Sequence, residues 1–525
     1  MDTNMEYLET ALAEPFGSLP ALVGLHARHR PQHRAVVLGE RSLTYAELAL
    51  AMDRVAARLQ RAGLASGDVI AVCAGTSLEY LLVFLGALRA GVVVAPLAPS
   101  ATAAHLDAML ANAQARLLFR DAEVASEWAL ADASIPCIAL DDSGSGQPWS
   151  RWLAEGAGAA AQAIAPQPDW AFNLIYSSGT TGVPKGIIQS WGMRWAHMKR
   201  AEINGYGPGT VSLSATPLYS NTTLVAALPT LGMGGTLVLM RKFDSAEYLR
   251  LAQQEGATHT MLVPVQYQRL MNFAGFDAAE LSRLTTKFCT SAPFKAALKA
   301  EVLRRWPGRL IEYYGMTEGG VGCELHCDQH PDKLHTVGRP RDGVDVRFID
   351  EQGRELPPGQ TSEMGEIVGR SSAMMTGYYR LPEKTREAEW FDAAGLRFIR
   401  TGDVGRLDED GFLVLGDRKK DMIISGGFNI YPSDIEQVLL QHPQVQECAV
   451  VGVASEQWGE TPVAYAVLRP GTDAGAAELQ AWLNGRVGKT QRVAELLLVP
   501  QLPRSEIGKV LKRELRERYE RSSEK

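Results

Sequence analysis

Short apolar runs along this chain alternate with stretches in which apolar residues recur every three or four positions. VIAVC (69–73) and GVVVAPL (91–97) are apolar almost throughout, which is typical of strands buried on both faces of a sheet. The stretch before them begins with a capping-box pattern at Thr44 and Glu47, and its apolar residues then repeat at helical spacing. Strand and helix patterns that alternate in short units predict a parallel, doubly wound sheet.

The same alternation resumes in the middle of the chain. Apolar runs recur at FNLIYSS (172–178), GTLVLM (235–240) and THTMLVP (258–264), and KAALKAEVLRRW (295–306) has the spacing of a helix. We therefore predict that the N-terminal part is a large α/β domain built on doubly wound sheets.

The pattern changes after residue 335. DVRFIDEQGREL (345–356) and FIRTGDVGRLDEDGFLVLGD (398–417) read as short strands around turns, which predicts a small β-rich subdomain. Beyond the charged stretch DRKKD (417–421), the patterns predict a smaller α+β domain of ordinary size. We place the boundary near Asp417–Lys420, which gives an N-terminal domain of residues 1–417 and a C-terminal domain of residues 418–525.

Composition narrows the classes of function. The chain has 525 residues, more than one core usually holds, so at least two domains are expected. A net charge of −7 provides no general basic field for nucleic acid. The N-terminus lacks the features of a secretory signal, and the longest apolar stretches are interrupted by Pro and Gly. We expect the six cysteines to be free thiols, so the composition predicts a cytoplasmic protein that is not an integral membrane protein.

One cysteine cluster raises the question of a metal. In CELHCDQH (323–330) the spacing i, i+3, i+4, i+7 would let four side chains converge on zinc if the segment were helical: Cys323, His326, Cys327 and His330. The segment follows a glycine-rich turn without a clear helix cap, and zinc-finger ligand pairs are normally separated by a longer loop. We therefore predict that this cluster holds no functional metal.

YSSGTTGVPKG (176–186) concentrates glycines, hydroxyl groups and one lysine directly after an apolar strand. Phosphate loops of α/β proteins occupy this position, because glycines let backbone N–H groups approach an anion and Lys185 adds a positive charge. It is not a Walker A loop, since Pro184 precedes the lysine and Gly186 follows it. Taken alone, the loop is also consistent with a solvated linker.

Further motifs along the chain decide between these interpretations. Together with them, the loop resembles the signature of the adenylate-forming superfamily, which includes acyl- and aryl-CoA ligases, peptide-synthetase adenylation domains and luciferases. The motifs occur in the superfamily's order: YYGMTEGG (313–320), the ribose, hinge and pantetheine segments within 400–436, and PRSEIGKVLKREL (503–515). The resemblance covers nearly the whole chain.

The resemblance implies two half-reactions that use ATP, Mg²⁺ and CoA. A carboxylate is a poor electrophile, so it is first transferred to the α-phosphate of ATP, giving an acyl-adenylate and pyrophosphate. The thiol of CoA then takes the acyl group, because AMP is a good leaving group. Chemistry of this kind depends mostly on positioning and on stabilising charge.

Motif positions assign residues of the N-terminal domain to ATP. Tyr314 is expected to stack on adenine beside Gly315, Thr317 to contact the α-phosphate, and Glu318 to bind Mg²⁺ as a hard oxygen donor. The phosphate loop is expected to surround the β- and γ-phosphates through Ser177, Ser178, Gly179, Thr180, Thr181 and Lys185.

Further positions match the second part of the superfamily's site. Asp403 is expected to accept hydrogen bonds from the ribose hydroxyls, and Arg418 to face the ribose and phosphates. Lys509 matches the lysine that reaches the carboxylate and α-phosphate during adenylation. Lys420 matches the hinge about which the small domain rotates, and Gly426 with Gly427 leave room for the narrow pantetheine arm of CoA.

Without the resemblance, three of these residues have plainer interpretations. Glu318 would be an exposed turn carboxylate, and Asp403 would belong to a simple TGD turn. Lys509 would be the first cation of a basic amphipathic helix, KVLKRELRER (509–518).

Three segments are expected to form the acyl pocket: PLYSNTTLVAALP (217–229), FCTSAPF (288–294) and GGVG (319–322). Many superfamily members carry an aromatic residue followed by His in the first segment, where this chain has Tyr219 and Ser220. The polar side chains favour a medium-sized aromatic or aliphatic acid, with Gly319 and Gly320 leaving space at the pocket floor. The expected lining residues are Tyr219, Ser220, Thr222, Ser291, Gly319 and Gly320. Alternatively, the hydroxyl groups only pair with neighbouring backbone.

We therefore predict an ATP-dependent carboxylic acid–CoA ligase. The alternative is a stand-alone adenylating enzyme that loads an acyl carrier protein. A non-catalytic nucleotide-binding relative is disfavoured, because Lys509, Glu318, Asp403 and Arg418 are all in place. The expected partners are the small-molecule acid, ATP and CoA, without nucleic acid or membrane insertion, and a homodimer is kept as an option.

Overall fold

The structure is a computed structural model of the chain. It describes residues 6–132, 134–155, 160–177, 184–306, 308–357, 364–418, 421–425, 428–455, 458–505 and 508–523. By its internal contacts the chain divides into two compact units. Unit 1 comprises Met1–Asp345 and Gly369–Ile399, and unit 2 comprises Val346–Val368 and Arg400–Lys525.

The first sheet of unit 1 has the strand order β19-β9-β8-β4-β3-β5-β6-β7. The strands from β8 to β7 are parallel, and the β9 and β19 edge is antiparallel. In sheet order the strands are β19 (Gly377–Tyr378), β9 (Lys185–Ser190), β8 (Ala171–Ser177), β4 (Val93–Pro96), β3 (Val69–Cys73), β5 (Leu118–Arg120), β6 (Cys137–Ala139) and β7 (Gln147–Pro148).

The second sheet of unit 1 has the order β16-β15-β14-β13-β12-β10-β11-β1-β2, with a parallel centre and antiparallel strands at both edges. Its strands are β16 (Arg339–Pro340), β15 (Gly322–His326), β14 (Arg309–Gly315), β13 (Thr286–Cys289), β12 (His259–Leu262), β10 (Val211–Ser214), β11 (Thr236–Leu239), β1 (Arg34–Leu38) and β2 (Arg41–Thr44).

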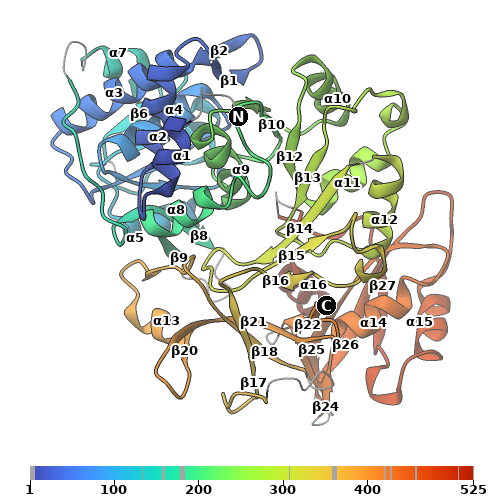
Figure 1. Cartoon of the computed structure of the whole chain (residues 1–525). Coiled ribbons are helices and arrows are strands. Elements are labelled where there is room, and N and C mark those ends of the chain that lie inside the picture. Colours follow the sequence, from blue (N-terminus) through green and yellow to red (C-terminus); the bar gives the residue numbers. More distant parts are fainter. Residues whose placement is uncertain are drawn as a thin grey trace. The chain divides into compact units, whose positions relative to one another are not determined.

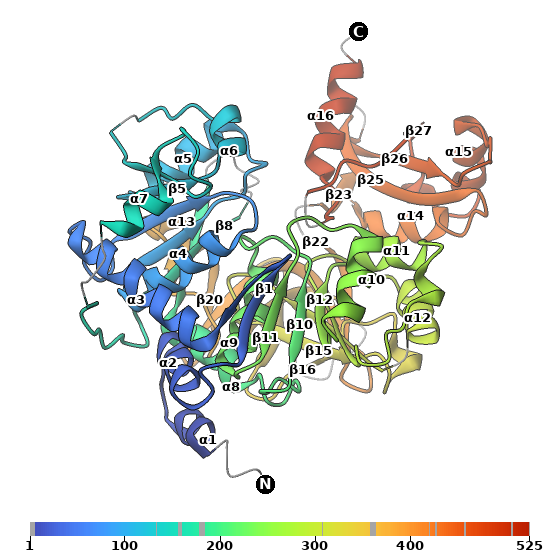
Figure 2. The ribbon, with the colours of Figure 1, turned by 90° about the horizontal axis from the view of Figure 1, so that it is seen from above.

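Helices cover both sheets of unit 1. In both views α10, α11 and α12 lie together along the second sheet (Figures 1 and 2). The helices of this unit are α1 (Glu6–Ala13), α2 (Leu19–His29), α3 (Tyr45–Arg61), α4 (Leu78–Arg89), α5 (Ala103–Ala113), α6 (Ala122–Glu127), α7 (Trp149–Ala154), α8 (Trp191–Lys199), α9 (Asn221–Gly232), α10 (Ser245–Gln254), α11 (Pro264–Met271), α12 (Ala296–Arg305) and α13 (Pro382–Glu387). Within the described ranges, none is long and apolar enough to cross a membrane.

The core explains why the central strands are apolar throughout. In β3, Ile70 and Val72 pack into the cluster that includes α3 and α4, whereas Ala71 and Cys73 pack into a second cluster with α5. Successive side chains of a strand point to opposite faces, so a strand covered on both faces needs apolar residues at every position. The capping box predicted at Thr44 is also present, with reciprocal hydrogen bonds between Thr44 and Glu47 at the start of α3.

Unit 2 contains the two hairpin-rich segments and the α+β region. In the third sheet the order is β17-β18-β21-β20, and β22 also pairs with β21. In the fourth sheet the order is β24-β23-β26-β25, and β27 also pairs with β26. The strands are β17 (Asp345–Ile349), β18 (Gly365–Arg370), β20 (Glu389–Phe391, in unit 1), β21 (Arg397–Leu407), β22 (Leu413–Arg418), β23 (Ile423–Ser425), β24 (Phe428–Ile430), β25 (Val445–Ser455), β26 (Gly459–Leu468) and β27 (Glu495–Leu498). Its helices are α14 (Pro432–Leu439), α15 (Ala476–Asn484) and α16 (Lys512–Ser523).

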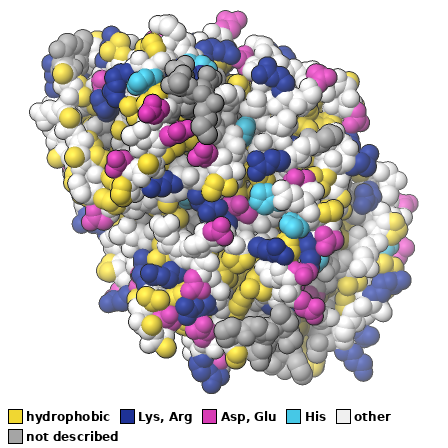
Figure 3. All heavy atoms as spheres, in the orientation of Figure 1, with side chains coloured by type: hydrophobic (Ala, Val, Ile, Leu, Met, Phe, Trp, Pro, Cys, Tyr) yellow, Lys and Arg dark blue, Asp and Glu magenta, His cyan; other side chains and the backbone are white. Residues whose placement is uncertain are grey.

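The predicted fold class is confirmed: a large α/β part with doubly wound sheets, a β-rich hairpin region and an α+β region at the C-terminal end. The predicted boundary near Asp417–Lys420 stays a prediction, because residues 419 and 420 lie outside the described part. The contact-based division also assigns 346–368 and 400–417 to the second unit. On the face shown in Figure 3, basic and acidic side chains are interspersed, so that face has no large region of one sign.

Candidate active site

The predicted site segments of unit 1 follow the carboxyl ends of parallel strands in the second sheet. The segment with Tyr219 follows β10, Ser291 follows β13, and Met316 to Gly320 follow β14. These strands lie close together in the sheet, in the order β14-β13-β12-β10. Ligands of open α/β sheets bind outside the carboxyl ends of the strands, so the sheet brings the predicted segments to one edge suited to binding.

Tyr378 connects two of the predicted ATP-site residues. Its hydroxyl donates a 2.8 Å hydrogen bond to Oε1 of Glu318, and its ring lies 5.2 Å from Nζ of Lys185. The backbone N–H of Met375 donates to the carbonyl oxygen of Glu318 at 2.7 Å. The loop after β14 and the first residue of β9 are therefore brought together around one aromatic ring.

A buried network of amide and guanidinium groups holds the backbone of Thr317 in place. Nε2 of Gln189 donates to the Thr317 carbonyl oxygen at 2.9 Å, and Oε1 of Gln189 accepts from the guanidinium of Arg194. Arg194 also donates to Oδ1 of Asn173, at 3.0 and 3.1 Å. Gln189, Asn173 and Arg194 are all buried, so this network fixes the backbone at the predicted α-phosphate contact.

The structure requires glycine at positions 319 and 320 for a reason other than the predicted space at the pocket floor. Both have positive φ, at 73° and 82°. A Cβ on Gly319 would overlap the carbonyl oxygen of Ala373, and one on Gly320 would lie 2.5 Å from the carbonyl oxygen of Gly369. The expected space at these glycines is therefore wrong, because backbone fills it. Their membership of the acyl pocket stays a prediction.

The hydroxyl groups expected in the acyl pocket have partners within the protein. Oγ of Ser220 caps α9 by accepting from the N–H of Thr222 at 3.2 Å, and Ser220 is buried. The Thr222 and Ser291 hydroxyls hydrogen-bond to each other, and Ser291 is exposed with a positive φ of 80°. The hydroxyl of Tyr219 is buried and has no hydrogen-bond partner among the described residues. The alternative interpretation, pairing with neighbouring backbone, thus explains the hydroxyl of Ser220. The hydroxyl of Tyr219 is left available to bind a ligand.

Several predicted residues lie outside the described part of the chain: Ser178, Gly179, Thr180, Thr181, Lys420, Gly426 and Gly427. The side chains of Ser177 and Arg418 are also outside it. Their predicted roles stay predictions.

In unit 2, Asp403 and Arg418 are directly opposite each other in the β21–β22 hairpin. The backbone N–H of Asp403 donates to the Thr401 hydroxyl at 3.0 Å, and the pairing shifts register between Asp403 and Gly405. Such an irregularity redirects a side chain out of the regular pleat. The TGD segment therefore belongs to a strand, and the simple turn is wrong.

Lys509 lies in a hairpin-like loop, and α16 begins only at Lys512. The carbonyl oxygen of Lys509 accepts from the Ser505 N–H at 2.9 Å, and its own N–H donates to Oγ of Ser505 at 3.2 Å. Arg504 and Val510 form an antiparallel bridge on either side. The interpretation of Lys509 as the start of a basic helix is therefore wrong, because hydrogen bonds fix its backbone in a loop.

The CELHCDQH segment contains a strand. Cys323 and Glu324 lie in β15, which pairs with β14, so helical spacing does not bring the four ligands together. Among the described residues, no group of three or more His, Cys, Asp or Glu could hold a metal ion. The absence of zinc stays a prediction. Elemental analysis of protein purified without chelator should find no stoichiometric zinc, and one zinc per chain would contradict this.

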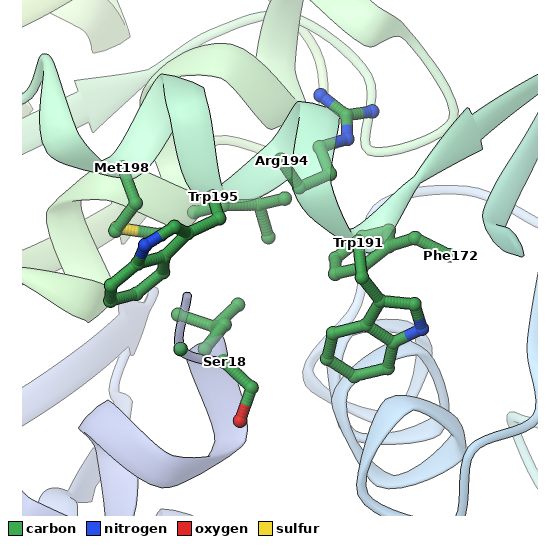
Figure 4. A pocket seen from close by; sticks show the side chains of 9 residues that line it. Ser18, Phe172, Trp191, Arg194, Trp195 and Met198 are labelled. Atoms are coloured by element: carbon green, nitrogen blue, oxygen red, sulfur yellow. The ribbon is translucent and has the colours of Figure 1, made fainter. Parts of the chain in front are cut away.

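A small apolar cavity lies beside α8, between Trp191, Trp195 and Met198 (Figure 4). Its volume of about 10 Å³ is no larger than the space that a single water needs, so it is not a substrate pocket. In Figure 4 the guanidinium of Arg194 points away from Trp195 and Met198.

Comparison with known proteins identifies the family. Residues 25–379 match the model of the AMP-binding enzyme, and residues 434–509 match that of the AMP-binding enzyme C-terminal domain. The chain belongs to the AMP-binding enzyme family. The predicted membership of the adenylate-forming superfamily is thereby confirmed.

Similar proteins span nearly the whole chain. A fatty acid–[acyl-carrier-protein] ligase, ScoC of Streptomyces coeruleorubidus, is 31% identical and covers 96% of this chain and 96% of its own. A feruloyl-CoA synthase of an Amycolatopsis species is 34% identical, covering 94% of this chain and 97% of its own. The structure of O-succinylbenzoate CoA synthetase of Bacillus subtilis in complex with ATP and magnesium ion has a TM-score of 0.79 and 26% identity, covering 94% of this chain and 98% of its own.

Sequence reasoning missed Tyr378, Gln189 and Arg194. Tyr378 is far from Glu318 along the chain, and nothing in its local sequence points to a carboxylate partner. Arg194 did carry a signal: it lies between Met193 and Trp195 on an apolar helix, where an arginine is expected to be buried and to need partners.

Proposed function

We propose that this protein is an ATP-dependent carboxylic acid–CoA ligase. In the first half-reaction, a carboxylate oxygen of the acid bonds to the α-phosphorus of ATP. The bond from that phosphorus to the bridging oxygen breaks, and pyrophosphate leaves. In the second, the sulfur of CoA bonds to the acyl carbon, the bond to AMP breaks, and the thiol proton passes to solvent. Both ATP and the acid are activated by placing charge close to the reacting atoms.

The arrangement around Tyr378 carries this proposal. It holds Glu318, the predicted Mg²⁺ ligand, and Lys185, the predicted phosphate contact, on one aromatic side chain. Mg²⁺ is usually bound by one or two carboxylates together with substrate phosphates and waters, and a single glutamate that shares Tyr378 with Lys185 fits that mode. Oε1 of Glu318 is engaged by Tyr378, so Oε2 is the oxygen we assign to the metal, which would neutralise charge on the phosphates.

The remaining assignments complete the proposed site. Tyr314 and Gly315 bind adenine, Thr317 contacts the α-phosphate, Asp403 and Arg418 bind ribose and phosphate, and Lys509 acts during adenylation. The phosphate loop, with Ser177 to Thr181, binds the departing pyrophosphate. Lys420 serves as the hinge, and Gly426 and Gly427 admit pantetheine.

The second part of the proposal concerns the thiol that accepts the acyl group. One similar protein is named as a CoA synthase and another as an acyl-carrier-protein ligase, so both thiols are represented. We choose CoA because the sequence carries the GGFNIYP segment (426–432) that resembles the pantetheine motif. The cytoplasm fits an enzyme that uses ATP and CoA and whose six cysteines are free.

The test is pyrophosphate release over a panel of carboxylic acids, with and without CoA, and mass spectrometry of the products. Release with at least one acid, and a thioester that requires CoA, support the proposal. Release that gives a thioester only on an added carrier protein would favour the alternative. Glu318→Gln should abolish release, whereas Glu383→Gln, an exposed glutamate of α13, serves as the matched control and should not.

A further inference from the structure

Three cationic or titratable side chains form a stripe on one face of α8 and its C-terminal cap: Arg194, His197 and Arg200. Their spacing of three residues places them on one side of the helix. Burial, together with Arg194, Arg341 and Arg200, lowers the pKa of His197 to about 3. Arg194, Arg200 and Arg341 therefore all act on His197, which is neutral.

One carboxylate faces this group. Glu324 in β15 lies 3.1 Å from Nη2 of Arg200 and 3.4 Å from Nη1 of Arg341, and 3.7 Å from Nε2 of His326. Burial alone would raise the pKa of Glu324, but the hydrogen bond from His326 and the two arginines bring it below its ordinary value. Glu324 is thus ionised and already shared between its neighbours.

Arg194 has no carboxylate partner among the described residues. Its side chain bonds to neutral amide oxygens, and its Nη1 is buried without any hydrogen-bond partner. The residue is only 4% exposed, and burial lowers its pKa to about 9. Nε of Arg200 and Nε of Arg341 are likewise buried without partners in the described part of the chain.

Among the described residues, Glu324 is the one carboxylate within ion-pair distance of these three guanidinium groups, so two of the positive charges have no acidic partner there. Arg194 is buried, whereas the side chains of Arg200 and Arg341 are 25% and 20% exposed. Buried charges are costly unless they are paired, and clusters that remain unpaired are candidate binding sites. A purely structural ion network would be expected to carry matching acids. The missing negative charge points to a ligand.

The cluster contacts two of the three segments expected to form the acyl pocket. Nη2 of Arg194 donates to Oδ1 of Asn221 at 3.0 Å, next to Ser220 and Thr222. Arg341 lies against Gly322, the last residue of the GGVG segment, where a Cβ would overlap its guanidinium. The backbone N–H of Arg341 also donates to the carbonyl oxygen of Gly322 at 3.0 Å. Glycine at 322 therefore leaves room for the guanidinium of Arg341 against a segment that is expected to line the acyl pocket.

We propose that the acid activated by this enzyme carries a second anionic group, a carboxylate or a sulfonate, which binds at Arg341, Arg194 and Arg200. This inference rests on the proposed function. The reacting carboxylate remains at the ATP site, and the second anion anchors the far end of the same molecule. Planar guanidinium groups suit both anions, because they donate two parallel hydrogen bonds.

The experiment compares acids that differ only in the second charge. Pyrophosphate release is measured with dicarboxylic and sulfo-carboxylic acids of graded length, and with the monomethyl ester of each dicarboxylic acid. The dianionic member of at least one pair should have a kcat/KM at least about tenfold higher than its ester, the ratio expected when one charged contact is lost. A panel in which every ester equals its diacid would overturn the inference and leave the proposed function standing.

Substitutions then locate the second anion. Arg341→Met should lower kcat/KM for the preferred dianion at least about tenfold, mainly through KM, and change that of its ester less than about threefold. Arg304→Met, an exposed arginine of α12, is the matched control and should change neither. Equal losses for dianion and ester in a folded Arg341→Met protein would contradict the assignment.

Glu324→Gln tests the same charge balance in the opposite direction. Removing the one competing carboxylate should lower KM for the dianion and leave the ester unaffected, and a rise in both KM values would count against the inference. If no acid supports pyrophosphate release, the proposed function fails. The inference is then decided by binding: a dicarboxylic acid should raise the melting temperature more than its monoester, and this difference should vanish in Arg341→Met.

Discussion

Glu318 illustrates how much of a residue's role depends on a partner distant in sequence. A glutamate in a glycine-rich loop is free to turn to solvent. Here the Tyr378 hydroxyl holds Oε1 at 2.8 Å, and the Met375 N–H holds the backbone of the same residue. Both partners come from a segment that reaches this loop only through the fold. The carboxylate is thus oriented before any ligand binds, which lowers the cost of binding one.

Tyr378→Phe should weaken adenylation by releasing Glu318. A hydrogen bond to a charged group is worth about 1.5–3 kcal/mol, so the rate of pyrophosphate release should fall at least about tenfold at limiting Mg²⁺. Because the ring remains, its contact with Lys185 is kept. Raised Mg²⁺ should restore part of the loss. The measurement is pyrophosphate release against Mg²⁺ concentration, with Tyr379→Phe as the neighbouring control, and an unchanged Mg²⁺ dependence would contradict the role.

Ser220 can be tested for its two possible roles. As the N-cap of α9 it should stabilise the protein, and Ser220→Ala should cost about 1 kcal/mol of unfolding free energy, measured by chemical denaturation. If its side chain also borders the acyl pocket, Ser220→Phe should raise KM for the acid and leave the Kd for ATP nearly unchanged. Equal damage to ATP binding would place Ser220 away from the pocket.

The residues that could be predicted from sequence are those inside contiguous motifs. Glu318, Lys185 and Asp403 are assigned to the proposed site because their neighbours along the chain match a motif. Tyr378 and Arg341 could not be found in this way, since each contacts its partner across separate strands or loops. The need for glycine at position 322 becomes clear only from the structure, in which the guanidinium of Arg341 occupies the place of a Cβ.

At the scale of elements, prediction succeeded wherever a segment's own pattern determines its structure. VIAVC forms β3 as predicted, because both of its faces are covered. CELHCDQH has helical spacing by coincidence, but pairing with β14 makes its first half, up to His326, extended, and a turn follows. The plainer interpretation of Lys509, as the start of a basic helix, fails for a similar reason: the basic run begins before α16, where hydrogen bonds to Ser505 define a loop.

The β14 strand depends on a buried ion pair. Glu312 contacts Nζ of Lys299 on α12, and Lys299 also donates to the carbonyl oxygens of Leu334 and Thr336, at 2.8 and 3.0 Å. Both side chains are almost fully buried. Burial raises the pKa of Glu312 to about 7, although Lys299 opposes this shift. The pair ties the helix, the strand and the loop after residue 333 together.

Lys299→Met should destabilise the protein by about 3–5 kcal/mol, because it leaves a buried carboxylate without its partner. A folded-state pKa raised above the ordinary value means that stability is retained at low pH and lost as pH rises through about 7. The loss should therefore be larger at about pH 8 than at about pH 5.5 in chemical denaturation. Lys299→Met with Glu312→Gln should recover most of it and remove the pH dependence, and equal losses at both pH values would contradict this account.

The residues assigned to the proposed site belong to both units of the chain. Glu318, Thr317 and Lys185 belong to unit 1, and Asp403 and Lys509 belong to unit 2. Lys509 lies in a loop of unit 2, and the glycines expected to admit pantetheine fall in the sequence between β23 and β24 of the same unit. We propose that the C-terminal part rotates about Lys420 between the two half-reactions and so presents Lys509 in the first and these glycines in the second.

This alternation predicts that two lysine substitutions have opposite effects. Lys509→Ala removes an ammonium that stabilises charge only during adenylation, a contribution of about 3–4 kcal/mol, so acyl-adenylate formation should slow at least about a hundredfold. Pre-formed acyl-adenylate supplied with CoA should still react at nearly the wild-type rate. The measurement is single-turnover kinetics of each half-reaction, with folding checked by melting temperature.

Lys420→Pro should do the reverse, because proline fixes φ and restricts the preceding residue, so the hinge cannot absorb the rotation. Adenylation should survive while thioester formation falls. Lys489→Ala, which removes a lysine of unit 2 outside both proposed positions, is the control for loss of charge and should leave both steps intact. Equal slowing of both half-reactions by Lys509→Ala in a folded protein would mean that Lys509 acts in both steps. That result would contradict the proposed alternation.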